Sequence, residues 1–149
     1  MFPLTITPVQ DERDLRKLRE FMLTQPQFYP GYRDWVDGKC VPRIASGQYK
    51  NLVIFSKDIV VGGSVYRFLD ENNVEIKNFR IDSHYRNRDL GHFAMRQVEQ
   101  ESKGKIINLD VSIDNHSGVE FFIRNGFHIF GKKQLYKPGQ DEYLMKKIA

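Results

Sequence analysis

Hydrophobic and polar residues follow two different periods along this chain, and each change of period predicts a new element. Stretches that alternate, or that are rich in β-branched and aromatic residues, predict strands over residues 4–7, 49–58, 59–69, 73–82 and 106–114, with two more inside 127–148. Apolar residues spaced three and four apart predict helices over residues 11–23, 88–103 and 117–127. Mixed strands and helices in this order indicate an α+β fold.

The strand predicted over residues 73–82 changes its pattern half-way along. Val74 and Ile76 are apolar at even positions, whereas Phe79 and Ile81 are apolar at odd positions. One extra residue near Lys77 and Asn78 would produce this change of phase, so we expect a β-bulge there. The strand over 106–114 follows a helix, and we therefore expect it to run parallel to the bulged strand through a right-handed crossover.

The helix between these two strands begins in a basic turn. We expect it to start near Arg88 and to end before Gly104, with an apolar stripe of Leu90, Phe93, Ala94 and Val98. Unpaired amides at a helix start, together with the helix dipole and the neighbouring Arg86, favour a bound anion such as a pyrophosphate. A basic, solvated helix start without a ligand would show the same residues.

Two further segments give weaker patterns. Residues 25–48 are interrupted by prolines and glycines and are rich in aromatics, so we expect a loop with one short helix near residues 32–38. Such loops often determine substrate specificity. In the last helix, Ser117 followed three residues later by Glu120 predicts a capping box, and Gly126 predicts the helix end.

Composition narrows the classes of protein that fit. A length of 149 residues favours a single domain over residues 1–149, and 40% hydrophobic residues favour a folded one. The net charge of +4 suits acidic small ligands but is too small for a typical nucleic-acid-binding surface. Cys40 is the single cysteine, which excludes an internal disulfide. Without a leader pattern or a long apolar run, we expect a soluble cytoplasmic protein.

Taken in order, these features resemble the GCN5-related N-acetyltransferase (GNAT) family over essentially the whole chain. The family signature R/Q-x-x-G-x-G/A falls on Arg86 through Gly91, and the pattern N-x-x-A-x-x-F-Y-x-x-x-G-F falls on Asn115 through Phe127. The resemblance implies a mixed, mostly antiparallel sheet of about seven strands flanked by helices. It also implies a bulged fourth strand and a parallel pair that splays to admit acetyl-CoA.

The resemblance assigns roles to individual residues. The bulged strand is expected to pair with the pantetheine arm, and the Phe79 N–H to face the thioester oxygen. The turn and helix start are expected to hold the pyrophosphate, and Asn115 and Phe122 to lie by the CoA arm. The implied cofactor-binding set is Phe79, Arg80, Ile81, Arg86, Asn87, Arg88, Asp89, Leu90, Gly91, His92, Asn115 and Phe122, with acetyl-CoA as co-substrate and no metal.

Glu75 is the expected general base, because it lies four residues before Phe79, where the histone-acetylating branch of the family has its catalytic glutamate. Two alternatives stay open: a carboxylate that binds the amine, or a solvated or cross-strand-paired residue of the strand. Since an amine has a pKa near ~10 and a glutamate near ~4, transfer through water or capture of neutral amine is expected.

Three positions depart from the family pattern. Asp89 stands where the first glycine is usual and puts a carboxylate near the expected phosphates. Gly118 replaces a common alanine. Phe122 replaces the tyrosine that often protonates the CoA thiolate, and Tyr136 and Tyr143 are the substitute donors to consider.

The resemblance implies an N-acetyltransferase that moves an acetyl group from acetyl-CoA to a primary amine of a small molecule or a protein, by direct attack in a ternary complex. A catalytically weak or degenerate acyl-CoA-binding module is the alternative, motivated by Asp89 and Phe122. A basic nucleic-acid-binding domain is a more distant one. The expected acceptor pocket lies between the loop at residues 25–47 and the hairpin at 134–143, with a homodimer possible and no membrane partner.

Overall fold

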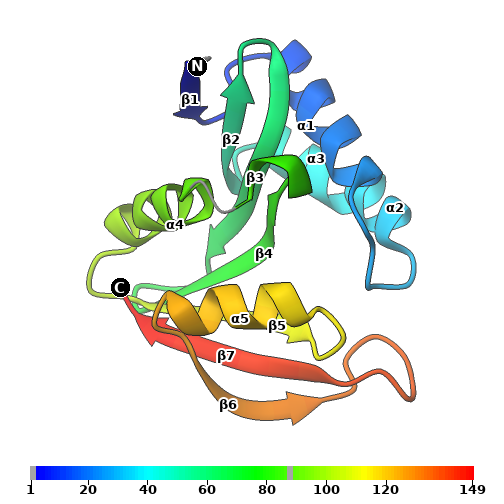
Figure 1. The fold of residues 1–149 in the computed structure, drawn as a ribbon, viewed down its shortest axis with the longest axis vertical. Helices are drawn as coiled ribbons and strands as arrows, with labels where there is room; N and C mark the ends of the chain where they lie inside the picture. The colour runs from blue at the N-terminus through cyan, green and yellow to red at the C-terminus, as the bar shows by residue number, and fades with distance from the viewer. Residues whose placement is uncertain (1–2, 87–88) are drawn as a thin grey trace.

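The computed structural model describes residues 3–86 and 89–149, which form a seven-stranded mixed sheet with helices on both faces (Figure 1). The sheet order is β1-β2-β3-β4-β5-β7-β6, and β4 and β5 form its parallel pair. The strands are β1 (Leu4–Thr7), β2 (Lys50–Ser56), β3 (Ile59–Phe68), β4 (Asn73–Ile81), β5 (Ile106–Ser112), β6 (His128–Lys133) and β7 (Glu142–Ile148). The expected α+β class and the seven-stranded sheet are confirmed.

The helices divide between the two faces of the sheet. One face is covered by α1 (Glu12–Thr24), α2 (Tyr32–Trp35), the π-helical segment η1 (Val36–Cys40) and α3 (Val41–Ala45), whose apolar residues pack on β2 and β3. The other face is covered by α4 (Leu90–Glu101) and α5 (His116–Arg124), which share a core with β4, β5 and β7. A short 3-10 turn, η2 (Ser83–Tyr85), joins β4 to the segment before α4. None of the helices in the described ranges is long and apolar enough to cross a membrane.

The bulge in β4 lies where the sequence places it. Val65 of β3 pairs with Asn78, and the next residue, Tyr66, pairs with Ile76, so Lys77 is the extra residue. Val74 and Ile76 therefore share the α4/α5 face with Phe79, which packs against the same core. The prediction of a bulge at this position is confirmed.

The parallel pair is short and opens toward the site. β4 and β5 pair over Asn73–Glu75 and Ile106–Asn108 and then diverge. Beyond the last pair, the edge of β4 after the bulge is directed toward the space between α4 and α5. The divergence creates the room that a ligand between the two strands would need.

Two sequence-based expectations about helices were wrong. Residues 32–45 are almost continuously helical rather than a loop with one short helix, because Pro42 lies in the first turn of α3, where its missing N–H costs little. In α4, Phe93 is 59% exposed, and Met95 is fully buried, so Met95 rather than Phe93 belongs to the core stripe.

Candidate functional site

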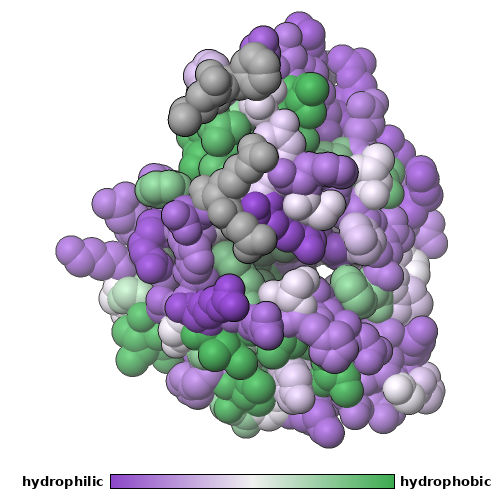
Figure 2. Space-filling model, in the orientation of Figure 1, coloured by the Kyte–Doolittle hydropathy of each residue, from purple (hydrophilic) through white to green (hydrophobic). Residues whose placement is uncertain are grey.

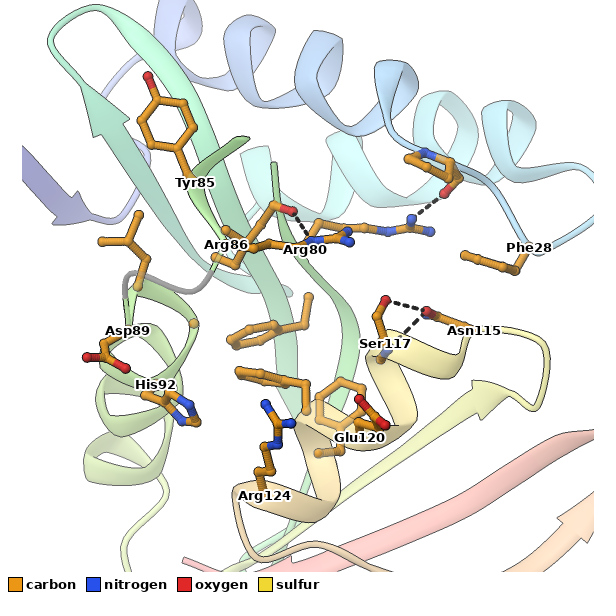
Figure 3. A pocket seen from close by; sticks show the side chains of 18 residues that line it. Phe28, Arg80, Tyr85, Arg86, Asp89, His92, Asn115, Ser117, Glu120 and Arg124 are labelled. Carbon is orange, nitrogen blue, oxygen red and sulfur yellow. Dashed lines mark hydrogen bonds between the residues drawn. The ribbon is translucent and has the colours of Figure 1, made fainter. Parts of the chain in front are cut away.

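A cavity of about 520 Å³ lies where β4 and β5 diverge, between the start of α4 and the helix α5. It opens on the face shown in Figure 2. Residues 79–81 of β4 line one wall, residues 89–92 the end near α4, and residues on α5 the opposite wall (Figure 3). Pro26 and Phe28, from the loop between α1 and α2, close one end.

The cavity brings together most of the residues that the sequence assigns to the cofactor. Asn87 and Arg88 lie outside the described residues, and Glu75 does not line the cavity. The cofactor candidates that line it are Phe79, Arg80, Ile81, Arg86, Asp89, Leu90, Gly91, His92, Asn115 and Phe122. These residues come from three separate segments of the chain, so a single cavity that contains them is a property of the fold.

An aromatic row, Phe79–Phe121–His92, joins β4 to α5 and α4 across the cavity. The Phe121 ring lies 5.2 Å from the Phe79 ring and 5.5 Å from the His92 ring, measured between centroids. A Cβ built on Gly91 would lie 2.6 Å from Cε1 of Phe121. Gly91 is therefore required for the packing of Phe121, in addition to any role beside a phosphate. Sequence reasoning missed Phe121, although it occupies the phenylalanine of the family pattern.

Arg80 is held at the opposite end of the cavity from α4. Its guanidinium donates to the carbonyl of Pro26 and lies over the rings of Phe28 and Tyr32, at 5.9 and 5.8 Å from their centroids. Partial burial lowers the pKa of Arg80 from its usual value. These contacts hold the Arg80 guanidinium in place, and they also attach the loop between α1 and α2 to β4.

The start of α4 lies close to the expected one. The helix begins at Leu90, and Asp89 occupies the N-cap position in the left-handed region, with φ of 61°. The Asp89 side chain makes no capping hydrogen bond, so the first amides of the helix have no partner from it. Arg86 donates from Nε to the Ile81 carbonyl at 3.2 Å and also lines the cavity. Helix-start amides that the Asp89 side chain does not cap, with a cation beside them, suit an anion.

The start of α5 differs from the predicted one. The N-cap residue is Asn115 rather than Ser117, because the Asn115 side chain accepts a hydrogen bond from the Gly118 N–H at 3.1 Å. A Cβ on Gly118 would lie 2.5 Å from Nδ2 of Asn115. Glycine at position 118 therefore leaves the space that the Asn115 side chain needs in its capping conformation. Asn115 lines the cavity as well, next to Ser117 (Figure 3).

Glu75 lies on the sheet face opposite α4 and α5 and forms two ion pairs. Its Oε1 lies 2.9 Å from Nε of Arg67 and 3.3 Å from Nζ of Lys77, and its side chain is 25% exposed. Both carboxylate contacts are therefore with cations on the same sheet face, and Glu75 does not line the cavity. The catalytic role of Glu75 stays a prediction.

The two substitute proton donors differ in their surroundings. Tyr136 donates from its hydroxyl to Oδ1 of Asp110 at 2.8 Å, and burial raises the pKa of Tyr136 above its usual value. Tyr143 packs against the core on the α4/α5 side. Burial raises the pKa of the Cys40 thiol to about 12, which makes Cys40 a poor nucleophile. Within residues 3–86 and 89–149, no group of three or more histidine, cysteine or acidic side chains is arranged to hold a metal ion.

Comparisons with known proteins agree with the fold. The sequence model of the Acetyltransferase (GNAT) family matches residues 13–127, which is more than half of the chain. The chain belongs to this family, and an acetyltransferase of the family takes acetyl-CoA as its co-substrate. The expected class of enzyme is confirmed. Among curated protein sequences, none matches the chain.

Solved structures share the fold at low sequence identity. A GNAT-family acetyltransferase from Desulfovibrio desulfuricans is similar over 98% of this chain and 99% of its own, with a TM-score of 0.84 and 17% identity. An N-acetyltransferase from Escherichia coli that acts on an alanine of a ribosomal protein is similar over 97% and 92%, with a TM-score of 0.72 and 16% identity. A streptothricin acetyltransferase from Bacillus anthracis, solved with acetyl coenzyme A, is similar over 68% and 63%, with a TM-score of 0.62 and 19% identity.

Proposed function

We propose that this protein transfers the acetyl group of acetyl-CoA to a primary amine by direct attack in a ternary complex. The observation that carries the proposal is the cavity at the divergence of β4 and β5, which joins an extended strand edge to a helix start that the Asp89 side chain does not cap. A thioester with a long polar arm and a pyrophosphate fits both features. The acceptor amine would approach from the other face of the sheet.

In this proposal, the protein acts mainly by positioning the two substrates. The backbone of Phe79, Arg80 and Ile81 pairs with the pantetheine arm, and the Phe79 N–H donates to the thioester oxygen as negative charge develops there. The amides at the start of α4 hold the pyrophosphate, with Arg86 nearby. Such placement lowers the entropic part of the barrier and stabilises the tetrahedral intermediate.

The thiolate leaves without help from a hydroxyl at position 122. Phe122 is buried, lines the cavity and packs against Phe79 and Phe127, and its ring has no proton to give. A CoA thiol has an acidity comparable with that of cysteine, whose pKa is about 8.5, so its thiolate is a tolerable leaving group near neutral pH. We therefore expect a slower enzyme than one with a tyrosine here, but an active one.

A degenerate acyl-CoA-binding module is the second candidate. The exposed carboxylate of Asp89 at the expected phosphate end and the absent hydroxyl at Phe122 both favour it. The two candidates share CoA binding and differ in turnover. Release of CoA thiol that depends on an added amine would distinguish them.

CoA and acetyl-CoA are expected to raise the melting temperature of the protein. A ligand at about 100 times its dissociation constant stabilises the folded state by about 2.7 kcal/mol, which corresponds to roughly 5–10 °C for a chain of this size. The measurement is differential scanning fluorimetry with CoA, acetyl-CoA and, as a control, pantetheine, which lacks the pyrophosphate. An unchanged melting temperature at millimolar CoA would contradict the proposed function.

A further inference from the structure

The Arg80 side chain lies on the sheet face opposite α4 and α5, which the acceptor amine would approach. Phe79, its neighbour in β4, packs into the core on the α4/α5 side, and successive residues of a strand point to opposite faces. The guanidinium accordingly lies over the ring of Tyr32 in α2. Figure 3 shows the side chain extending toward Phe28, with Asn115 of α5 across the cavity from it. Its charged group is therefore at the end of the cavity away from the start of α4.

The guanidinium has one edge in use and one edge free. Its Nη1 donates to the carbonyl of Pro26. Its Nε and Nη2 form the edge that pairs with carboxylates, and within residues 3–86 and 89–149 neither atom has a hydrogen-bond acceptor. Arg19 shows how this edge is used elsewhere in the chain, since its Nε and Nη2 lie 2.6 and 3.1 Å from the two carboxylate oxygens of Asp37. The free edge of Arg80 has the same donor geometry.

Asp82 is the carboxylate nearest to Arg80 in the sequence, but its oxygens are engaged elsewhere. It follows β4 directly and lies two residues from Arg80. Its carboxylate accepts hydrogen bonds from the His84 N–H at 2.9 Å and from Nε2 of Gln25 at 3.4 Å. In the described part of the chain, Asp82 forms an ion pair with His84 and none with Arg80. Arg80 therefore has no counter-ion from its own segment.

The ionisable groups that act on the Arg80 guanidinium supply no negative charge near neutral pH. Tyr29 and Tyr32 are two of them, and burial raises the pKa of both hydroxyls, that of Tyr32 to about 12. Arg86 is the third and is itself a cation. Burial lowers the pKa of Arg80, and the charge of Arg86 acts in the same direction. A partly buried cation without a counter-ion is costly, so this end of the cavity favours an anionic ligand.

Two substrates bring anionic groups to such a cavity, and their expected positions differ. The pyrophosphate of CoA is assigned to the start of α4, at the opposite end from the Arg80 guanidinium. The guanidinium lies instead on the acceptor side of β4. Its plane is already held by the Pro26 carbonyl and by the rings of Phe28 and Tyr32, so little side-chain entropy is lost when an anion binds. These positions favour an anionic group of the acceptor.

We propose that the Nε/Nη2 edge of Arg80 binds a carboxylate of the acceptor, and that the acceptor is an amino acid or a similar primary amine with a carboxylate near its amino group. The inference rests on the proposed acetyl transfer. Two N–H donors from one planar group fix the carboxylate, and the short chain between carboxylate and nitrogen then directs the amine toward the thioester carbon. An amine without a carboxylate leaves the edge unpaired and binds less tightly. Arg80 is thus a specificity-determining residue.

The test compares three amino acids with their primary amides. The acids are glycine, β-alanine and 4-aminobutanoate, and steady-state acetylation by the full chain gives kcat/KM for each acid and each amide. The acid-to-amide ratio in the wild type is divided by the ratio in a variant, which cancels the basicity of each amine. For at least one pair, Arg80→Met should lower kcat/KM about 30-fold for the acid, mainly through KM, and less than about 3-fold for the amide. Arg80→Lys keeps the charge without the fork and should lower the ratio about 5-fold.

Arg43→Met is the matched control. The Arg43 guanidinium also lies over a tyrosine ring, 5.6 Å from the centroid of Tyr49, and donates to the Tyr49 hydroxyl at 3.1 Å, but it does not line the cavity. Its acid-to-amide ratios should equal those of the wild type. Equal losses for acid and amide in Arg80→Met would overturn the inference and leave Arg80 as a support of the loop between α1 and α2. Weaker calorimetric binding of CoA with an unchanged ratio would also overturn it and assign the anion to CoA.

Folding and turnover are controlled separately. Melting temperatures with and without CoA show whether each variant folds, and if Arg80→Met does not, an unchanged ratio in Arg80→Lys overturns the inference. If the wild-type chain shows no turnover, calorimetric titration of the same acids and amides into the CoA-saturated protein replaces the kinetics. Acid binding that Arg80→Met removes would support the site although the proposed transfer fails. No binding of any of the three acids to the wild type at millimolar concentration would overturn the site.

Discussion

Gly91→Ala is expected to destabilise the protein by about 1–3 kcal/mol and to remove most of the stabilisation by CoA. The added Cβ would lie 2.6 Å from the Phe121 ring, which packs against Phe79 and His92 and cannot yield without leaving that row. A displaced Phe121 changes the cavity wall, and the new methyl group also restricts the approach of a phosphate to the helix start. The measurements are urea unfolding and the CoA titration of the melting temperature.

A double substitution separates the two causes. Gly91→Ala combined with Phe121→Leu relieves the clash but keeps the methyl group at the helix start, so recovery of CoA binding would assign the effect to packing. Continued loss would assign it to the phosphate. Gly38→Ala is the matched control, because a Cβ there meets nothing within 4 Å. Unimpaired stability and CoA binding in Gly91→Ala would contradict the structure at this point.

Asp89→Gly is expected to act in the opposite direction and to tighten CoA binding by about 10-fold. Removing a carboxylate near a doubly charged pyrophosphate is worth about 1–2 kcal/mol at the effective dielectric of a protein surface. Glycine also adopts the left-handed conformation of this position freely, although it loses more chain entropy on folding, so the net change in stability should be small. Isothermal titration with CoA measures the affinity.

Asp89→Asn separates charge from conformation. Asparagine tolerates the left-handed region as aspartate does, so it removes the charge and keeps the backbone preference. If charge is the cause, both variants bind CoA more tightly, and the gain falls as salt concentration rises. If only the glycine variant improves, the backbone at the helix start limits binding. Weaker binding in both would mean that Asp89 contributes to the CoA site.

The sheet was predictable because its signals are local. The alternation along residues 106–112 and the phase change at Lys77 are properties of consecutive residues, and a one-residue slip would turn buried side chains to solvent. The position of a basic turn before a helix was predictable, since basic residues and a helix start are adjacent in sequence, and anion binding there stays a prediction. The exact first residue of α4 was not predictable, because it depends on the left-handed conformation of Asp89.

The missed features depend on contacts between distant segments. Nothing near Phe121 in sequence shows that Gly91 must make room for its ring. Asn115 and Ser117 are both suitable N-cap residues for α5, and the geometry of the turn after β5 places Asn115 in that position. The hydrogen bond from Tyr136 to Asp110 forms because the C-terminal hairpin folds beside β5, so no local pattern could have singled out Asp110.

Amine-dependent release of CoA thiol from acetyl-CoA is the most direct test of the central claim. The full chain is incubated with acetyl-CoA and a panel of alkylamines, diamines and peptides with free amino termini, and both products are quantified. The account predicts that at least one amine is acetylated in equal amount to the thiol released, and that no release occurs without an amine beyond slow hydrolysis. CoA binding without acetylation of any amine in the panel would contradict it and leave a binding module in its place.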